Sequence, residues 1–165
     1  MYYDSIPSPI GDITLIWNEA GLHVAEFSNE GKRLSGAMKK LRPTRAPDGM
    51  INKAPWPKAF EHYFADNLHA FDGLSLVLEG SDFQRKVWAA LQRIEVGTTK
   101  NYGEIALEIG SPGAARAVGT ANGQNPVAII VPCHRVIASD GTLAGYGGGV
   151  DRKHWLLRHE GAILV

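Results

Sequence analysis

The spacing of apolar residues changes at Gly80 and Ser81, and this change constrains the fold more than any other feature of the sequence. The residues before it combine alternating and helical spacing, whereas those after it favour helices. Ser81 and Gln84 have the spacing of a capping box, which marks the start of a helix. Because 165 residues can bury one sizeable core or two small ones, we expect an α/β domain over residues 1–80 and a mostly α domain over residues 81–165.

The first domain is expected to begin with a β-hairpin and to continue with helices. Apolar residues alternate on both sides of a turn, and later segments repeat at helical spacing with two prolines between them. The expected elements are, in order, strands at 13–17 and 22–27, helices around 34–41 and 60–64, and a strand at 74–78.

Two further helices are expected soon after the one that begins at the capping box. The first spans residues 102–109 and ends at Gly110, and the second runs from a cap at Ser111 to about Asn122. Two short helices joined by a tight, glycine-containing turn have helix-turn-helix geometry.

The only cysteine, Cys133, lies directly beside His134 and behind an apolar run. A free thiol with a pKa of ~8.5 is only a few per cent thiolate at neutral pH, so a nucleophilic cysteine needs a neighbour that takes its proton. His134 is the candidate. The alternative is a buried, inert cysteine that ends a β-strand, because free cysteine packs as a small hydrophobic residue.

Five short segments together are similar to the signature of one family. The segment Pro-Cys-His-Arg-Val at 132–136 resembles the active-site motif of the O6-alkylguanine-DNA alkyltransferases, also called methylated-DNA–protein-cysteine methyltransferases. The segments 102–106 and 113–119 resemble the family's helix-turn-helix, and 145–149 and 153–161 resemble its substrate loop and closing helix. The resemblance implies a ribonuclease-H-like α/β first domain and a winged-helix-like, DNA-binding catalytic second domain.

The resemblance also implies a reaction, in which an alkyl group passes from O6-alkylguanine, and from O4-alkylthymine, to Cys133. His134 would take the thiol proton through a water molecule, and Glu160 would orient His134. The product would be an inactive S-alkylcysteine protein after a single turnover. A carboxylate at the predicted helix C-terminus opposes the helix dipole, so Glu160 is expected to have a partner.

Double-stranded DNA is the partner that the resemblance implies, bound through the minor groove. The helix ending near Asn122 consists mostly of small residues, which suits a groove only ~6 Å wide. Arg116 would fill the space left by a flipped-out nucleotide, and Tyr102 would lie against a phosphate of the target. The alternatives are close helix packing for the small residues and a half-buried structural aromatic for Tyr102.

Other site residues are carried over from the resemblance. The remaining DNA-binding residues are Ser111, Ala115, Gly119 and Ser139, and those of the alkyl pocket are Asn125, Val136, Tyr146, Gly147, Gly148 and Lys153. For Asn125, a structural role within its turn is expected rather than a chemical one. Many relatives carry serine at the position of Gly147, so one hydrogen bond to the guanine O6 is in doubt here. The alternative for the glycine run is a plain flexible loop.

Charge gives only limited support to DNA binding, because 17 basic residues balance 17 acidic ones. Between Glu108 and Asp140 there is no acidic residue, while Arg116 and Arg135 are present. The DNA-binding face is therefore expected to lack repulsive carboxylates and to bind weakly, with moderate salt dependence.

No cofactor or metal is expected, because six histidines and one cysteine show no paired ligand spacing. A composition of 44% hydrophobic and 21% charged residues, with no long apolar run, predicts a soluble, cytoplasmic protein, which we expect to be a monomer. A single cysteine, which cannot form an internal disulfide, suits a reducing compartment.

Two other functions compete with alkyl transfer. One is an alkyltransferase-like protein that recognises damaged bases without repairing them, but such relatives replace the cysteine that this chain retains at position 133. The other is a cysteine hydrolase or thiol redox sensor that uses Cys133 and His134, although a redox sensor would usually have a second, resolving cysteine.

Overall fold

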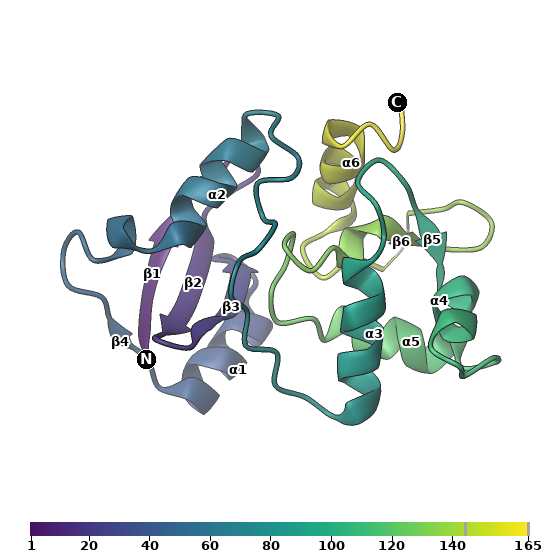
Figure 1. Cartoon of the computed structure of the whole chain (residues 1–165), viewed down its shortest axis with the longest axis horizontal. Coiled ribbons are helices and arrows are strands. Elements are labelled where there is room, and N and C mark those ends of the chain that lie inside the picture. Colours follow the sequence, from purple (N-terminus) through teal and green to yellow (C-terminus); the bar gives the residue numbers. More distant parts are fainter. Residues whose placement is uncertain (144, 165) are drawn as a thin grey trace. The chain divides into compact units, whose positions relative to one another are not determined.

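The chain divides into two compact units in a computed structural model that describes residues 1–143 and 145–164. Unit 1 comprises Met1–Leu78 and unit 2 comprises Glu79–Val165. Unit 1 is an α/β unit, and unit 2 is mostly helical (Figure 1).

Unit 1 is built on a four-stranded sheet with the strand order β3-β2-β1-β4. Its strands are β1 (Tyr2–Ile6), β2 (Ile13–Asn18), β3 (Gly21–Phe27) and β4 (Thr44–Arg45). The expected hairpin is present as β2 and β3, which pair antiparallel, as do β1 and β2; β1 and β4 are parallel. The sequence pattern predicts neither β1 nor the short β4.

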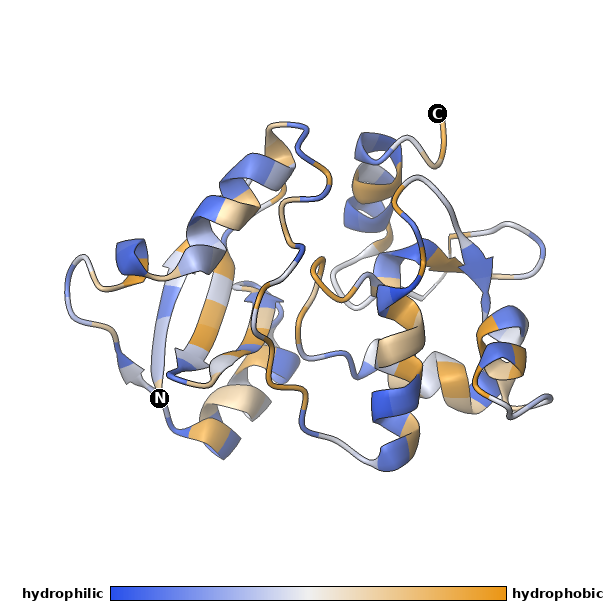
Figure 2. Cartoon of the chain, viewed as in Figure 1, coloured by the Kyte–Doolittle hydropathy of each residue, from blue (hydrophilic) through white to orange (hydrophobic). Residues whose placement is uncertain are grey.

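One helix covers each face of this sheet, and this is why β2 and β3 are almost entirely buried. Helix α2 (Pro55–Phe64) lies on one face, where Trp56 packs against Trp17 with ring centroids 6.1 Å apart. Helix α1 (Gly31–Leu41) lies on the other face, where Arg33 forms an ion pair with Glu26 of β3 at 2.9 Å. Hydropathic colouring shows the apolar length of β2 between them (Figure 2). A short 3₁₀ helix, η1 (Ile51–Lys53), precedes α2.

The strand expected at residues 74–78 does not form. Only Leu76 makes a bridge, to Leu22 at the beginning of β3. At this point the two backbones approach so closely that a Cβ atom on Gly21 would lie 2.7 Å from the carbonyl oxygen of Ser75. The alternating leucines correctly indicate a half-buried segment. They do not indicate whether a neighbouring strand can pair with the segment along its whole length.

The described residues of unit 2 form four α-helices, one 3₁₀ helix and a two-stranded parallel sheet. They are α3 (Asp82–Gln92), α4 (Tyr102–Glu108), α5 (Ala115–Gly123) and α6 (Val150–His159), with strands β5 (Lys100–Asn101) and β6 (Val136–Ile137) and the 3₁₀ helix η2 (Cys133–Arg135). The core is formed by fully buried apolar side chains of the helices, among them Val87, Leu91, Ile105, Val118 and Leu156.

The predicted capping box is confirmed at the start of α3. The Ser81 side chain accepts a hydrogen bond from the backbone N–H of Gln84, whose own side chain accepts one from the Ser81 backbone N–H. Trp88 then anchors α3 to α5, because its indole N–H donates to the carbonyl oxygen of Ala121 at 2.9 Å. The capping box fixes the beginning of α3, and Trp88 holds α3 against α5.

Helices α4 and α5 are the expected helix-turn-helix pair, but α5 begins later than predicted. Gly110 and Gly113 both have positive φ angles in the turn between them, which favours glycine. The expected cap at Ser111 is wrong, because α5 starts at Ala115 without a side-chain cap. Ser111 instead accepts a turn hydrogen bond from the backbone N–H of Ala114.

Candidate active site

The only cysteine lies in a tight turn rather than at the end of a strand. Cys133 begins η2 and is 5% exposed. Its backbone N–H donates to the carbonyl oxygen of Val131 at 2.8 Å, and the N–H of Arg135 donates to that of Pro132 at 3.0 Å. Cys133 and His134 are adjacent in sequence, but successive side chains of a 3₁₀ turn point in different directions.

The segment before Cys133 is held in a conformation that costs free energy. Ile129 is 1% exposed and has a φ angle of +71°, which is a rare backbone conformation for a β-branched residue. Such strain typically costs ~1–3 kcal/mol and persists only where the surroundings impose it. Asn125 imposes it from both sides, because its amide donates to the carbonyl oxygen of Val131 and accepts from the N–H of Val127. Both hydrogen bonds are to backbone groups, and a structural role for Asn125 stays a prediction.

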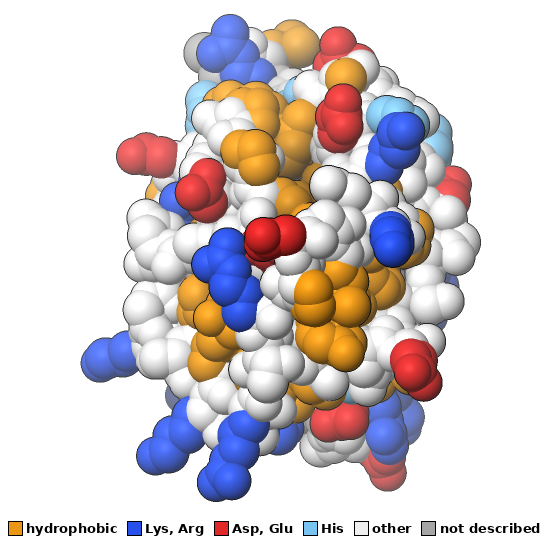
Figure 3. Space-filling model, turned by 90° about the vertical axis from the view of Figure 1, so that its left-hand side faces the viewer, with side chains coloured by type: hydrophobic (Ala, Val, Ile, Leu, Met, Phe, Trp, Pro, Cys, Tyr) orange, Lys and Arg blue, Asp and Glu red, His pale blue; other side chains and the backbone are white. Residues whose placement is uncertain are grey.

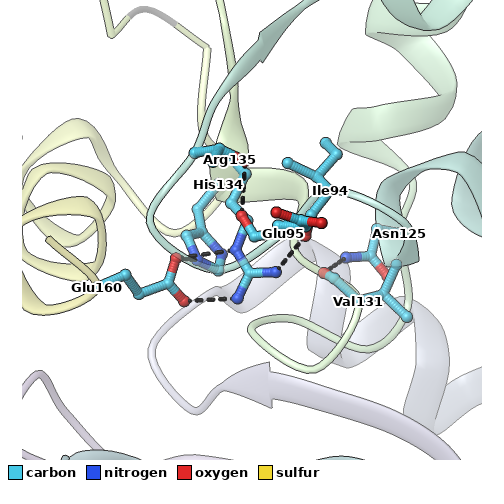
Figure 4. Close-up of polar contacts among 8 residues, drawn as sticks. Ile94, Glu95, Asn125, Val131, His134, Arg135 and Glu160 are labelled. Atoms are coloured by element: carbon cyan, nitrogen blue, oxygen red, sulfur yellow. Dashed lines mark hydrogen bonds and ion pairs between the residues drawn. The ribbon is translucent and has the colours of Figure 1, made fainter. Parts of the chain in front are cut away.

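His134, Glu160 and Arg135 form a connected polar cluster, in which His134 and Arg135 directly follow Cys133 in the sequence (Figure 4). The Nε2 atom of His134 lies 3.0 Å from Oε1 of Glu160. The guanidinium of Arg135 donates to both oxygens of the same carboxylate, at 2.9 Å and 2.8 Å. Its third donor reaches the carbonyl oxygen of Ile94 at 2.7 Å. The side chains of His134 and Glu160 are completely buried.

Arg135 does not lie on an exposed DNA-binding face, so the prediction that counted it there is wrong. Its side chain is only 10% exposed, and all three of its hydrogen bonds are internal. Glu160 lies at the C-terminal cap of α6, where its negative charge is unfavourable, and Arg135 is the positively charged partner that offsets it. No spacing rule connects residues 135 and 160, so the sequence does not predict this ion pair. The only signal for it is that the charge of Glu160 needs a positively charged partner.

The cluster keeps Glu160 charged and His134 neutral. Burial alone would raise the pKa of Glu160, but the hydrogen bonds from Arg135 and His134 outweigh it and hold this pKa well below its usual range. Burial lowers the pKa of His134, and Glu160 only partly opposes that effect. Since an ionised carboxylate can only accept, Nε2 carries the proton that is donated to Glu160.

The other ring nitrogen of His134 is therefore unprotonated and basic. This Nδ1 atom is buried and has no hydrogen-bond partner within residues 1–143 and 145–164. A buried, unpaired acceptor is costly, which indicates a site where a proton is meant to arrive.

Two further ionisable groups lie within electrostatic reach of the thiol. The Lys153 ammonium is fully buried and donates to the carbonyl oxygen of Val136. Burial lowers the pKa of Lys153, whereas the negative charge of a Cys133 thiolate raises it. Burial and then the same thiolate raise the pKa of Tyr102, so its phenol remains protonated at neutral pH. A positive charge and a hydroxyl donor thus flank the nucleophile.

Tyr102 lies between α5 and the glycine-rich loop. A Cβ atom on Gly119 would lie 3.7 Å from the Tyr102 ring, and one on Gly145 would lie 3.6 Å from its hydroxyl oxygen. Tyr102 is therefore in contact with both of the elements that the resemblance assigns to DNA and to the alkyl pocket.

The remaining predicted site residues fall into an exposed and an enclosed group. The exposed residues are Arg116 on α5 and, in loops, Ser139 and Gly147. The half-buried residues are Ser111, Ala115, Gly119 and Tyr146, and the buried ones are Val136 and Gly148. The Arg116 side chain makes no hydrogen bond or ion pair with any residue that the structure describes. Arg116 is thus the long polar side chain that α5 leaves available for a ligand.

The described part of the chain contains neither a metal-binding cluster nor a membrane-spanning helix. Among residues 1–143 and 145–164 there is no group of three or more histidine, cysteine or acidic side chains that could hold a metal ion. In the same residues, no helix has the length and apolar character needed to cross a membrane.

Comparison with known proteins identifies both units. Residues 1–78 match the family described as the 6-O-methylguanine DNA methyltransferase ribonuclease-like domain, and residues 82–162 match its DNA-binding domain.

Several curated relatives share almost the whole chain. A methylated-DNA–protein-cysteine methyltransferase of Methanosarcina barkeri is 48% identical over 97% of both chains. One of Mycolicibacterium paratuberculosis is 47% identical over 99% of this chain and 96% of its own. Among solved structures, that of Mycobacterium tuberculosis OGT in complex with DNA superimposes with a TM-score of 0.85 at 45% identity, covering 98% of this chain and 94% of that one.

Proposed function

Because this chain belongs to the family of methylated-DNA–protein-cysteine methyltransferases, we propose that it repairs O6-alkylguanine in duplex DNA by transferring the alkyl group to Cys133. The observation that carries this proposal is the buried cluster of His134, Glu160 and Arg135, two of whose members directly follow the only cysteine in the sequence. This cluster holds a neutral base next to a thiol, which is what a thiolate nucleophile requires.

The first step is removal of the thiol proton. Nδ1 of His134 accepts it through a water molecule, and the resulting imidazolium is stabilised by the Glu160 carboxylate that already accepts from Nε2. The Lys153 ammonium contributes a second favourable charge toward the thiolate. Glu160 does not take up the proton itself, because Arg135 and His134 hold its pKa too low.

The second step is a direct displacement at the alkyl carbon. The sulfur of Cys133 forms a bond to this carbon while the bond from carbon to O6 breaks, and the electron pair goes to the guanine. The guanine anion then takes one proton. In this proposal Tyr102 donates it, which is supported by a phenol that stays protonated at neutral pH and interacts electrostatically with Cys133. The same displacement applies to O4-alkylthymine.

DNA engagement follows from the exposed face of α5. A protein thiolate cannot reach O6 of a stacked, paired guanine, so the nucleotide must be flipped out of the duplex. The exposed Arg116 would occupy the vacated space, and the small residues of α5 would allow it to enter a widened minor groove. One copy of the chain contains every residue that these steps use, so we propose that a monomer acts.

The experiment uses a duplex that carries a labelled methyl group on O6 of one guanine. The label should move to the wild-type protein and remain on the DNA with Cys133→Ala, whose affinity for the duplex should be nearly unchanged. Release of the label as methanol would identify a hydrolase. Binding without any movement of the label by the wild-type protein would identify a damage-recognition module and overturn the proposal.

A further inference from the structure

The balanced charge of the chain conceals one strongly basic segment in unit 1. Residues 31–47 contain six lysines and arginines and no acidic residue, between Glu30 and Asp48. We call residues 31–47 the basic segment; it comprises α1, β4 and their connection.

The cations of the basic segment differ in whether they have partners. Arg33 pairs with the buried Glu26, and Arg45 lies 3.7 Å from Asp4. The other four, Lys32, Lys39, Lys40 and Arg42, are exposed and form no ion pair with any of the described residues. Their charges are therefore not used inside the protein.

Three of these free cations lie on one face of α1. The half-buried Leu34, Ala37, Met38 and Leu41 mark the face of α1 that packs on the sheet. Lys32 and Lys39 are seven residues apart, so they lie on one outward face, with Lys40 beside them. Between them are Ser35 and Gly36, and a Cβ atom on Gly36 would meet nothing within 4 Å. A ligand can therefore approach the helix backbone between the lysines.

Helix stability does not account for this arrangement. Lys39 and Lys40 lie in the last turn of α1, where positive charge is favourable. Lys32 lies in the first turn, which contains no acidic residue, and there positive charge opposes the helix dipole. Space-filling colouring of one face of unit 1 shows Lys and Arg side chains gathered at its lower left (Figure 3). The gathering points to an external polyanion.

Unit 2 is poor in cations that could bind such a polyanion. Residues 79–165 contain nine basic and eight acidic residues. Arg135 and Lys153 are buried, and Arg85, Arg93 and Lys100 pair with carboxylates. Non-specific affinity for DNA comes from the number of phosphates that lysine and arginine neutralise. The exposed Lys86, Arg116 and Arg158 remain, but they lie far apart in the sequence, whereas Lys32, Lys39, Lys40 and Arg42 lie within eleven residues.

We propose that the basic segment binds phosphates of duplex DNA through Lys32, Lys39 and Lys40, as a second DNA contact separate from α5. This inference rests on the proposed function only in taking DNA as the ligand. The contact is insensitive to base sequence and damage, and it holds the protein on undamaged DNA between encounters with alkylated bases.

The test compares two double variants that each remove two exposed positive charges from unit 1. Lys32→Gln with Lys39→Gln alters the basic segment, and Lys53→Gln with Lys58→Gln alters η1 and α2. Affinity for an undamaged duplex several helical turns long is measured by fluorescence anisotropy over a series of salt concentrations. The first variant should bind at least about tenfold more weakly at low salt, with a slope of log affinity against log salt reduced by up to about 1.8.

The control variant should retain the wild-type slope and affinity within about twofold. Equal losses in both variants would show a general charge effect, and wild-type slopes in both would show that the lysines are only solvated; either result overturns the inference. Thermal unfolding of both variants checks that they are folded. Methyl transfer by the wild-type protein is measured separately, so failure of the proposed function is distinguishable from failure of this contact.

Discussion

The Glu160 carboxylate accepts hydrogen bonds from two side chains that affect its neighbourhood differently. Arg135 binds both carboxylate oxygens, and His134 shares one of them. Because the guanidinium already compensates the carboxylate charge, less attraction remains to hold a proton on His134, and the positive charge of Arg135 itself disfavours imidazolium. His134 therefore stays neutral in the resting protein and is ready to accept a proton from Cys133.

The neutral state of His134 makes stability depend on pH. The unfolded chain protonates this residue near its ordinary pKa of 6.5, whereas burial lowers the pKa in the folded protein. Below pH 6.5 the unfolded state consequently binds more protons, so stability falls as pH falls, by at most about 1.4 kcal/mol per pH unit from this residue. Above pH 6.5 this contribution is fully present.

Urea unfolding of the full chain at pH 7.5 and pH 5.5 measures this effect. The midpoint of unit 2 should drop at the lower pH, and His134→Gln should drop less, because glutamine does not titrate. An identical pH dependence in both proteins would show that His134 titrates alike in the folded and unfolded states.

Glu160→Gln tests the polarising role of the carboxylate. The neutral amide stabilises imidazolium less well, so transfer should slow by about 10²-fold, the lower end of what a positioned base contributes. The rate should fall equally with an alkylated duplex and with free O6-benzylguanine, because the change affects chemistry and not DNA. The buried charge of Arg135 also loses its partner, which destabilises by ~3–5 kcal/mol. Rates are therefore measured at a temperature where circular dichroism shows the variant to be folded.

Among the elements, α5 connects the surface that we propose for DNA to the turn that contains Cys133. Arg116 is exposed near its beginning, and Asn122 near its end donates to the carbonyl oxygen of Cys133 at 3.4 Å. Gly119 lies against Tyr102 between them. One short helix therefore contacts Cys133 and Tyr102, and in our proposal it also reaches the vacated base stack.

Arg116→Ala separates these tasks. Only duplex repair requires a side chain that replaces the flipped base, so transfer from an alkylated duplex should fall by at least about tenfold, in line with a stacking cost of a few kcal/mol. Reaction with free O6-benzylguanine should keep its rate. Equal losses with both substrates would assign Arg116 to folding or chemistry.

The elements that sequence predicted well carry a local signal. The capping box of α3 and the hairpin of β2 and β3 are examples, because the residues that specify them lie next to one another. Predictions failed where the outcome depended on distant partners. The segment at 74–78 finds only one bridge, and the expected cap at Ser111 belongs to a turn.

The same distinction holds within the candidate site. Neighbours in sequence, such as Cys133 and His134, could be selected from composition and resemblance, and their catalytic roles remain predictions. The fork between Arg135 and Glu160 and the strained backbone of Ile129 could not be found, because both arise from packing. Charge counting even placed Arg135 on the surface, since it cannot distinguish a buried cation from an exposed one.

At the scale of the whole molecule, chemistry and charge are divided between the two units. Unit 2 contains the proposed nucleophile and base, Cys133 and His134, and the helix-turn-helix. Unit 1 contains the largest group of unpaired cations. In this account unit 1 contributes affinity for the DNA backbone, and unit 2 recognises and repairs the base.

Methylation of Cys133 should destabilise unit 2. The cysteine is 5% exposed and follows the fully buried Val131. An added methyl group in such a site typically costs ~1–3 kcal/mol, and the thiolate that His134 and Lys153 were arranged to hold is lost. The melting temperature should fall by several degrees after complete methylation. An unchanged or raised melting curve would mean that the site already has room for the product.

The central claim is that each chain accepts one alkyl group on Cys133 and keeps it. A thioether has no good leaving group, and Cys133 is the only cysteine of the sequence, so no second thiol can take the alkyl group from it. The measurement is the intact mass of the protein after incubation with an excess of O6-methylguanine duplex, together with a count of the repaired guanines. We predict a gain of one methyl group per chain and one repaired guanine per chain. Many repaired guanines per chain, or an unchanged protein mass after repair, would contradict the account.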